Sequence, residues 1–179
     1  MIYNVAQLLK AQVGTSLSIE LDDSEPLNLE DDSARLVQPV AGKIRFRRTN
    51  QGILADGRVQ AEVEMTCVRC LEPFTSTIAF RLEEEFYPTV DVVTGIFLPE
   101  TENEMIFPID HNHQLDLREA MRQNLLLALP MQPLCKEDCA GLCPQCGKNL
   151  NEGPCNCQPQ EDERFSVLKD LFANTAQQE

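Results

Sequence analysis

Eight cysteines fall into two groups that could bind a metal ion. Six lie within residues 135–157 and two form a separate pair upstream, the full set being Cys67, Cys70, Cys135, Cys139, Cys143, Cys146, Cys155 and Cys157. Two thiolates separated by two residues can reach the same tetrahedral ion, and thiolate ligands suit zinc better than the harder cations. After Cys146, Gly147 also lets backbone amides turn back toward the sulfurs, as in a zinc knuckle. The sequence therefore predicts zinc bound by thiolates.

Eight thiolates can be shared between zinc ions in more than one way. The arrangement that leaves no thiol unused gives one ion to Cys67, Cys70, Cys135 and Cys139 and a second ion to Cys143, Cys146, Cys155 and Cys157. An alternative groups Cys67 and Cys70 with Cys143 and Cys146 around one ion, and leaves the others free or on a second ion. We expect the first arrangement, with two ions. Four thiolates leave no open position for water, so such sites would be structural.

Other uses of cysteine fit the sequence less well. No secretory signal is visible, and a cytoplasmic chain usually keeps its thiols reduced, which disfavours structural disulfides. A thioredoxin-like redox pair would open a helix in a βαβ unit, and neither C-x-x-C pair is placed in that way. An iron–sulfur cluster also takes four cysteines, and spacing alone does not exclude it. Buried, inert cysteine is the simplest alternative, but two compact groups disfavour it.

The cysteine-containing segments resemble a known protein family. Residues 67–74, 133–151 and 155–157 are similar to the YceD family, which is described as the large ribosomal RNA subunit accumulation protein and has bacterial and chloroplast members. The similarity extends, more weakly, from residues 4–10 to residues 162–168. The resemblance implies a role in the accumulation of large-subunit rRNA, with no defined catalytic activity. It also implies a cytoplasmic location in bacteria, and a chloroplast location in plant relatives.

The charge of the chain bears on its partners. With 15 basic and 29 acidic residues the formal net charge is −14. A protein that grips RNA phosphates usually carries a basic face, because counterion release drives such binding. We therefore expect a basic ribosomal or assembly protein as the partner, since opposite charges steer association. Direct rRNA contact stays open through the strand that contains Lys43, Arg45, Arg47 and Arg48.

The chain offers no enzyme site. It contains no evident nucleophile–base pair, no glycine loop for phosphate and no isolated pair of carboxylates, and it suggests no small-molecule substrate. It has no apolar run long enough to span a membrane, so no membrane partner is expected. The sequence thus predicts a non-catalytic, zinc-stabilised factor of large ribosomal subunit biogenesis. A thiol redox or metal-sensing protein, and a direct rRNA-binding module, are the alternatives.

Alternating apolar residues predict the strands that hold the first cysteine pair. The alternation covers residues 17–21 and 44–46, a turn follows at residues 49–52, and the alternation resumes over residues 53–65 with a turn or bulge at Asp56-Gly57. It continues over residues 74–82. Cys67 and Cys70 should therefore lie at the tip of a long antiparallel hairpin. The basic residues around Arg45 should face Glu62 and Glu64 across the sheet.

The remaining segments predict helices and loops. A short helix is expected at residues 1–12, an acidic loop at 22–32, an acidic loop or irregular crossing at 83–103, and an edge strand at 105–109. His111-Asn112-His113 fits a polar turn. A buried helix should begin with a capping box of Asp116 and Glu119 and end before Pro130. A last helix should begin near residue 161, with Phe165, Leu168 and Phe172 along one side.

These elements together predict an α+β protein. We expect an antiparallel β-sheet or barrel-like meander with a buried helix and a cysteine-rich zinc-knuckle module. The expected divisions are a β domain with its packing helix at 1–130, the cysteine-rich module at 131–160 packed on the hairpin tip near 67–70, and a short helix and tail at 161–179.

Overall fold

A computed structural model of the chain describes residues 1–21, 27–29, 34–99 and 107–157. Its elements are β1 (Ile2–Asn4), α1 (Ala6–Lys10), β2 (Ser16–Leu21), β3 (Ala34–Leu36), β4 (Ala41–Arg48), β5 (Ile53–Thr66), β6 (Pro73–Pro88), β7 (Phe107–Ile109), β8 (Gln114–Asp116), α2 (Arg118–Ala128) and the 3₁₀ turn η1 (Leu150–Glu152). Most of the predicted acidic loop at 22–32 and the whole helix predicted near residue 161 lie outside the described residues. The predicted division into three parts stays a prediction.

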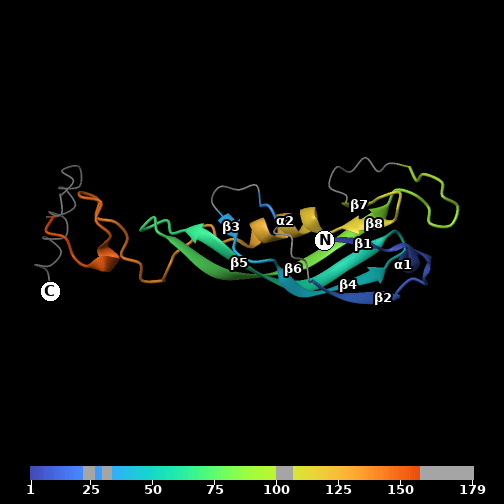
Figure 1. Ribbon diagram of the computed structural model, residues 1–179, viewed down its shortest axis with the longest axis horizontal. Coiled ribbons are helices and arrows are strands. Elements are labelled where there is room, and N and C mark those ends of the chain that lie inside the picture. Colours follow the sequence, from blue (N-terminus) through green and yellow to red (C-terminus); the bar gives the residue numbers. More distant parts are fainter. Residues whose placement is uncertain (22–26, 30–33, 100–106, 158–179) are drawn as a thin grey trace, which may run out of the picture.

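The strands form one curled sheet (Figure 1). The strand order is β1-β8-β7-β6-β5-β4-β2, and β3 pairs with β5 beyond the end of β4. All pairs are antiparallel except β6 with β7. The molecule is therefore mostly sheet with few helices, as the fold-class prediction states in its coarse form.

The β5–β6 hairpin is the longest feature of the sheet. Its register runs from Ile53 opposite Phe86 to Thr66 opposite Pro73, so residues 67–72 form its tip. The period-two pattern of β5 explains this length, because Val59, Ala61 and Val63 all face the core and are at most 2% exposed. The hairpin carries the first cysteine pair away from the body of the sheet (Figure 1).

Helix α2 covers the apolar face of the sheet and packs on β6. Ala120, Met121 and Leu125 are fully buried in this contact, whereas Leu127 on the opposite side is 85% exposed. The helix is therefore buried along one face only, as its spacing of apolar residues requires. The loop after α2 then runs along the hairpin toward the tip.

Two local predictions about the termini of elements were wrong. Residues 2–4 form a strand rather than the start of a helix, because they pair with Gln114–Asp116 of β8. Helix α2 begins at Arg118, and Asp116 accepts a hydrogen bond from the Arg118 backbone amide at 3.0 Å. Glu119 does not reach back to cap the helix, because its carboxylate binds the side chains of Arg122 and Gln123.

Three predictions about strands and turns were also wrong. Asp56-Gly57 is neither a turn nor a bulge but lies within β5, where a Cβ on Gly57 would be 2.3 Å from the Lys43 carbonyl oxygen of β4. Residues 83–88 continue β6, so the loop predicted from residue 83 begins only at residue 89. The part of the predicted edge strand that is described, β7, lies inside the sheet between β6 and β8. Residues 111–113 form a turn, as predicted.

Asp56 is the carboxylate that balances the basic residues of β4. Arg45 and Arg47 reach its oxygens at 2.7 and 3.3 Å, whereas Glu62 and Glu64 lie farther along β5 and oppose Thr77 and Thr75 of β6. The expected partners were therefore wrong, because the register of β4 places Arg45 directly opposite Asp56. The hydrogen bond from Arg45, above all, holds the pKa of Asp56 below its ordinary value of 3.8.

Replacement of Asp56 by asparagine is expected to lower the Tm at pH 7. A carboxyl whose pKa is lower in the folded than in the unfolded chain stabilises the fold above the unfolded pKa, and this contribution is lost as pH falls. The Tm difference between wild type and Asp56→Asn should therefore shrink as pH falls below 3.8. Glu83→Gln, which breaks the exposed Arg81–Glu83 pair, is the control and should leave the Tm unchanged. A difference that does not change with pH would contradict this role of Asp56.

Candidate metal centre

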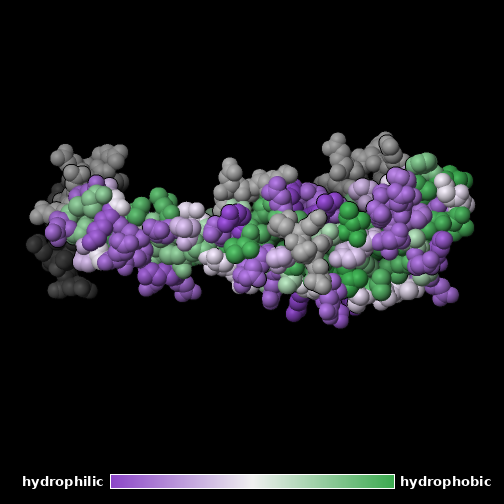
Figure 2. Space-filling model, viewed as in Figure 1, coloured by the Kyte–Doolittle hydropathy of each residue, from purple (hydrophilic) through white to green (hydrophobic). Residues whose placement is uncertain are grey.

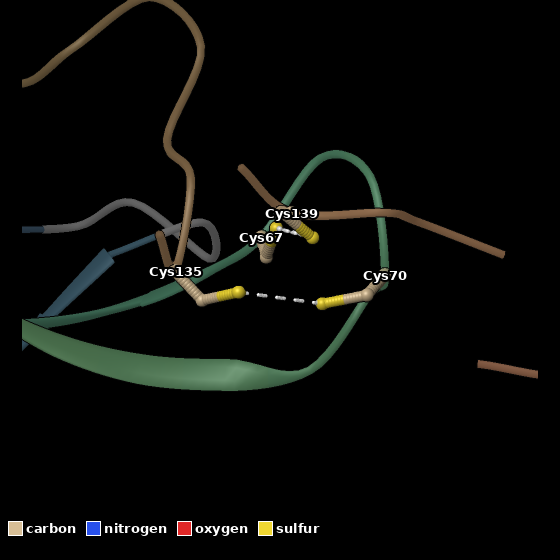
Figure 3. Close-up of side chains that lie close together, drawn as sticks. All are labelled: Cys67, Cys70, Cys135 and Cys139. Atoms are coloured by element: carbon tan, nitrogen blue, oxygen red, sulfur yellow. Dashed lines mark hydrogen bonds between the residues drawn. The ribbon is translucent and has the colours of Figure 1, made fainter. Parts of the chain in front are cut away.

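Four thiols meet at the tip of the β5–β6 hairpin. Cys67 and Cys70 come from the tip itself, and Cys135 and Cys139 come from the segment that follows α2 (Figure 3). The Sγ atoms of Cys67 and Cys139 are 3.8 Å apart, and those of Cys70 and Cys135 are 3.7 Å apart. All four sulfurs lie within 4.8 Å of one another, so they surround a common point.

These separations fit zinc and do not fit disulfides. Four sulfurs that each lie about 2.3 Å from a tetrahedral zinc ion stand about 3.8 Å from one another. A disulfide would bring two sulfurs to about 2.05 Å, and all eight cysteines are free thiols. Cys67, Cys70 and Cys139 are buried, with at most 3% exposure, whereas Cys135 is exposed, so an ion held among them would be shielded from water except on the side of Cys135. The residues present therefore fit a structural zinc ion.

A second group of four thiols lies in the C-terminal module. It consists of Cys143, Cys146, Cys155 and Cys157, whose Sγ atoms also lie within 4.8 Å of one another. Cys143 is buried, and Cys146 is exposed. The chain between the two pairs turns through η1 and is held by a hydrogen bond from Lys148 Nζ to the Pro154 carbonyl oxygen at 3.0 Å. The second group is therefore local in sequence, whereas the first joins distant segments.

The two C-x-x-C turns share one backbone conformation. In the first, Cys67 N donates to Glu72 O at 3.0 Å and Leu71 N donates to Cys67 O at 2.9 Å. In the second, Cys143 N donates to Lys148 O and Gly147 N donates to Cys143 O, both at 2.9 Å. Residues Leu71 and Gly147 both have positive φ, at 60° and 72°. Leucine hides this equivalence in the sequence, because glycine is the residue expected at that position.

The pKa values of the thiols show why a cation would suit each group. Burial opposes ionisation of Cys67, but backbone amides of Cys135, Cys70 and Arg69 outweigh it and lower the pKa of that thiol to about 6. Amides of Cys146 and Gln145 likewise lower the pKa of Cys143 to about 6.

Cys135 in the first group and Cys157 in the second resist ionisation instead. Burial, and then the neighbouring Cys70, raise the pKa of Cys135 to about 12. The neighbouring Cys146, and then burial, raise the pKa of Cys157 to about 12. A divalent cation would reverse this preference, because it compensates four crowded thiolates at once.

Contacts beyond the cysteines fix the first group in place. Val68 N donates to the Pro133 carbonyl oxygen at 3.0 Å, which ties the segment after α2 to the hairpin tip. The Arg69 guanidinium donates to the Cys139 carbonyl oxygen at 3.0 Å, and Leu142 N donates to Arg69 O at 3.1 Å. Phe74, Leu134 and Leu142 pack around the buried cysteines.

The structure brings together all eight candidate cysteines in the preferred arrangement. The alternative group of Cys67, Cys70, Cys143 and Cys146 is not one of the groups among the described residues. Metal ligation itself stays a prediction. Sequence reasoning missed Arg69 and Asn151, which contact Cys139 without being ligands. No local signal marks them, because their partners lie 70 and 12 residues away.

The chain is similar to proteins that are named for the accumulation of ribosomal RNA. A family model described as "Large ribosomal RNA subunit accumulation protein YceD" matches residues 55–172. An uncharacterised protein of Mycobacterium tuberculosis is 33% identical over 130 residues, which is 72% of this chain and 60% of the relative. A chloroplastic maize protein named as a YCED homolog for large ribosomal RNA subunit accumulation is 25% identical over 168 residues. The match covers 80% of this chain and 57% of the maize protein.

A protein of Haemophilus influenzae that carries the YceD name is 31% identical over 84 residues, which is 46% of this chain and 45% of that protein. This chain thus spans 60% of the mycobacterial relative and less of the other two. No solved structure matches. Among the residues that the structure describes, no helix is long and apolar enough to cross a membrane.

Proposed function

This chain belongs to the YceD family, and we propose that it is a non-catalytic, zinc-stabilised factor that promotes the accumulation of large-subunit ribosomal RNA by docking a basic partner protein. The family match over residues 55–172 carries the part of the proposal that concerns rRNA. The two groups of four thiols support the zinc. The family description names an accumulation protein and no reaction, which supports a non-catalytic role. A cytoplasmic location, where thiols stay reduced, is part of the proposal.

A basic protein is the partner that the charge favours. The chain carries a formal charge of −14, and proteins of opposite charge attract one another over long distances. Charge alone does not hold a complex together, because exposed ion pairs contribute little. An apolar contact is also needed, and one described loop has the composition for it.

The loop after β6 presents apolar side chains to water. Val93, Ile96 and Phe97 are 81%, 66% and 76% exposed. The loop lies at the end of the molecule opposite the cysteine-rich module (Figure 1), where hydrophobic residues gather on the surface (Figure 2). Exposed apolar clusters of this kind commonly mark protein interaction sites. We define this segment, residues 89–98, as the apolar loop.

The apolar loop is braced by hydrogen bonds of its own backbone and of the Asp91 side chain. Asp91 N donates to Ile96 O, and Leu98 N donates to Thr89 O, at 2.9 and 3.0 Å. The Asp91 carboxylate accepts hydrogen bonds from Val93 N, Thr94 N and Thr94 Oγ1 at 2.7–3.0 Å. A preformed loop loses little conformational entropy on binding, which favours its use as a docking element.

The double substitution Val93→Ser and Phe97→Ser is expected to abolish function without unfolding the protein. In a bacterial host that lacks its own family member, wild type should restore the ratio of large- to small-subunit rRNA, and the variant should not. The variant should also lose binding to purified large-subunit ribosomal proteins by at least about tenfold, because apolar anchors dominate interface energy. Leu127→Ser is the matched control, since Leu127 is also apolar and 85% exposed.

Two results would overturn the docking proposal. One is a double variant that restores the rRNA ratio as well as wild type does. The other is a wild-type protein that binds none of the purified ribosomal proteins at physiological salt. A host whose rRNA ratio is unaffected by wild type would contradict the proposed role in rRNA accumulation itself.

Direct rRNA binding is the second candidate, and the sheet register favours it. Lys43 lies opposite Arg58 on β4 and β5, and Arg58 lies opposite Arg81 on β6. Like charges that face one another destabilise a sheet, so this row is expected to have a use. If this candidate is correct, the wild-type protein should lower the electrophoretic mobility of large-subunit rRNA in a salt-sensitive way, and charge reversal at all three positions should abolish this effect. Unchanged rRNA accumulation after the reversal would exclude it.

A further inference from the structure

The C-terminal cysteine module touches the first thiol group through one side chain. Asn151 lies in η1, between the two cysteine pairs of the second group, and its Nδ2 donates to the Sγ of Cys139 at 3.3 Å. Cys139 belongs to the first group. Asn151 is therefore a described side chain of the second module that reaches a sulfur of the first.

The orientation of the Asn151 amide is fixed by its other partners. Its Oδ1 accepts a hydrogen bond from Ala140 N at 3.0 Å, and a backbone amide can only donate. The Nδ2 group must then face the sulfur, and it also donates to Asn149 Oδ1 at 2.9 Å. Asn149 Oδ1 in turn accepts from the backbone amide of Asn151 at 3.0 Å, which caps η1. The Nδ2 donor of Asn151 therefore faces the Cys139 sulfur.

The backbone near Asn151 forms a bridge between the two groups. Leu150 N donates to Gly141 O at 2.8 Å, and Leu142 pairs with Asn149. Gly141 has a φ of 72°, and a Cβ at this residue would lie 3.1 Å from the Arg69 carbonyl oxygen of the hairpin tip. The position of η1 relative to the first group is therefore set by close backbone contacts. Within its own module, η1 lies between the two cysteine pairs of the second group.

We propose that Asn151 positions Cys139 as a ligand of the first metal centre, so that the first centre binds its ion tightly only when the second centre is filled. The proposal rests on the zinc assignment made above. Filling the second group fixes Cys143 and Cys146 against Cys155 and Cys157, and it thereby fixes η1. Asn151 then holds the Cys139 sulfur in the orientation that a tetrahedral ion needs. Residues that orient metal ligands in this way commonly change affinity by about 10- to 100-fold.

Metal competition with a chromophoric chelator tests the role of Asn151. In the full chain, Asn151→Ala and Asn151→Asp should each weaken zinc binding at the first centre by at least about tenfold and leave the second centre unchanged. The aspartate variant keeps the oxygen that accepts from Ala140 but puts a carboxylate against the sulfur and against Asn149 Oδ1. Asn149→Ala, which removes the second of these contacts and leaves the sulfur contact, separates the two effects and should bind zinc at the first centre more tightly than Asn151→Asp. Asn156→Ala, an exposed asparagine of the same module, is the control and should bind both ions as wild type does.

A second measurement tests the coupling between the centres. Cys146→Ser, which empties the second centre, should weaken the first centre by about the same factor as Asn151→Ala, and the two changes together should weaken it no further. Cobalt in place of zinc gives an independent readout, because the thiolate-to-cobalt absorption of the first centre should change in the Asn151 variants.

The outcomes distinguish failure of the coupling from failure of the zinc assignment. If wild type binds two ions and the Asn151 variants bind both equally well, the coupling proposal fails and the zinc assignment stands. If Cys146→Ser leaves the first centre at wild-type affinity, the coupling also fails. If wild type binds no zinc in either centre, the zinc-stabilised function proposed above fails together with the coupling.

Discussion

Replacement of Cys70 by serine should reduce bound zinc from two ions per chain to one. Cys70 and Cys135 supply one pair of opposed sulfurs at 3.7 Å, and three thiolates do not complete a structural site. Zinc binding provides about 10–16 kcal/mol in small zinc-binding peptides, so its loss should release the segment after α2 from the hairpin tip. Elemental mass spectrometry on protein purified without added metal, with a free-thiol count, measures the loss.

Two variants serve as controls for Cys70. Cys146→Ser should also remove one ion. At a zinc concentration that keeps the first centre filled, the segment after α2 should stay protected from proteolysis in this variant. Val68→Ser, at a half-exposed position of the same turn, should retain both ions. Two ions bound to the Cys70 variant would refute its assignment as a ligand. If the wild-type protein contains iron and sulfide instead of zinc, the cysteines bind an iron–sulfur cluster and the zinc assignment is wrong.

Replacement of Gly52 by alanine should destabilise the protein more than replacement by alanine of any other glycine in the part of the chain that the structure describes. A Cβ at Gly52 would lie 2.0 Å from the carbonyl oxygen of Phe86, where the β5–β6 ladder begins. The clash is with backbone, so a side-chain rotation cannot relieve it. The free energy of unfolding should fall by about 3 kcal/mol, measured by urea denaturation at fixed zinc concentration.

Gly14→Ala is the matched control for Gly52. Gly14 has a φ of 92° but no atom within 4 Å of a Cβ, so only backbone strain opposes the alanine. The expected cost there is about 1 kcal/mol. Equal costs at the two positions would show that close packing of β5 on β6 does not decide the effect.

The sequence by itself determined the chemistry of the candidate site. Residue type and spacing within a short segment identify candidate thiolate ligands, because both cysteines of a C-x-x-C turn belong to one local structure. Period-two alternation likewise predicted the β5–β6 hairpin and placed Cys67 and Cys70 at its tip, since each strand carries its own pattern of burial. These inferences needed no information about distant parts of the chain.

Only the tertiary structure decided which distant groups meet. Cys70 and Cys135 are 65 residues apart, and they come together because α2 packs on β6 and its following loop returns to the hairpin tip. The partner of Arg45 is Asp56 rather than Glu62 for the same reason, since strand register depends on both strands at once. The contact of Asn151 with Cys139 likewise depends on how one module seats on another. Local pattern fixes what a residue can do, and packing between distant segments fixes with which partner it does it.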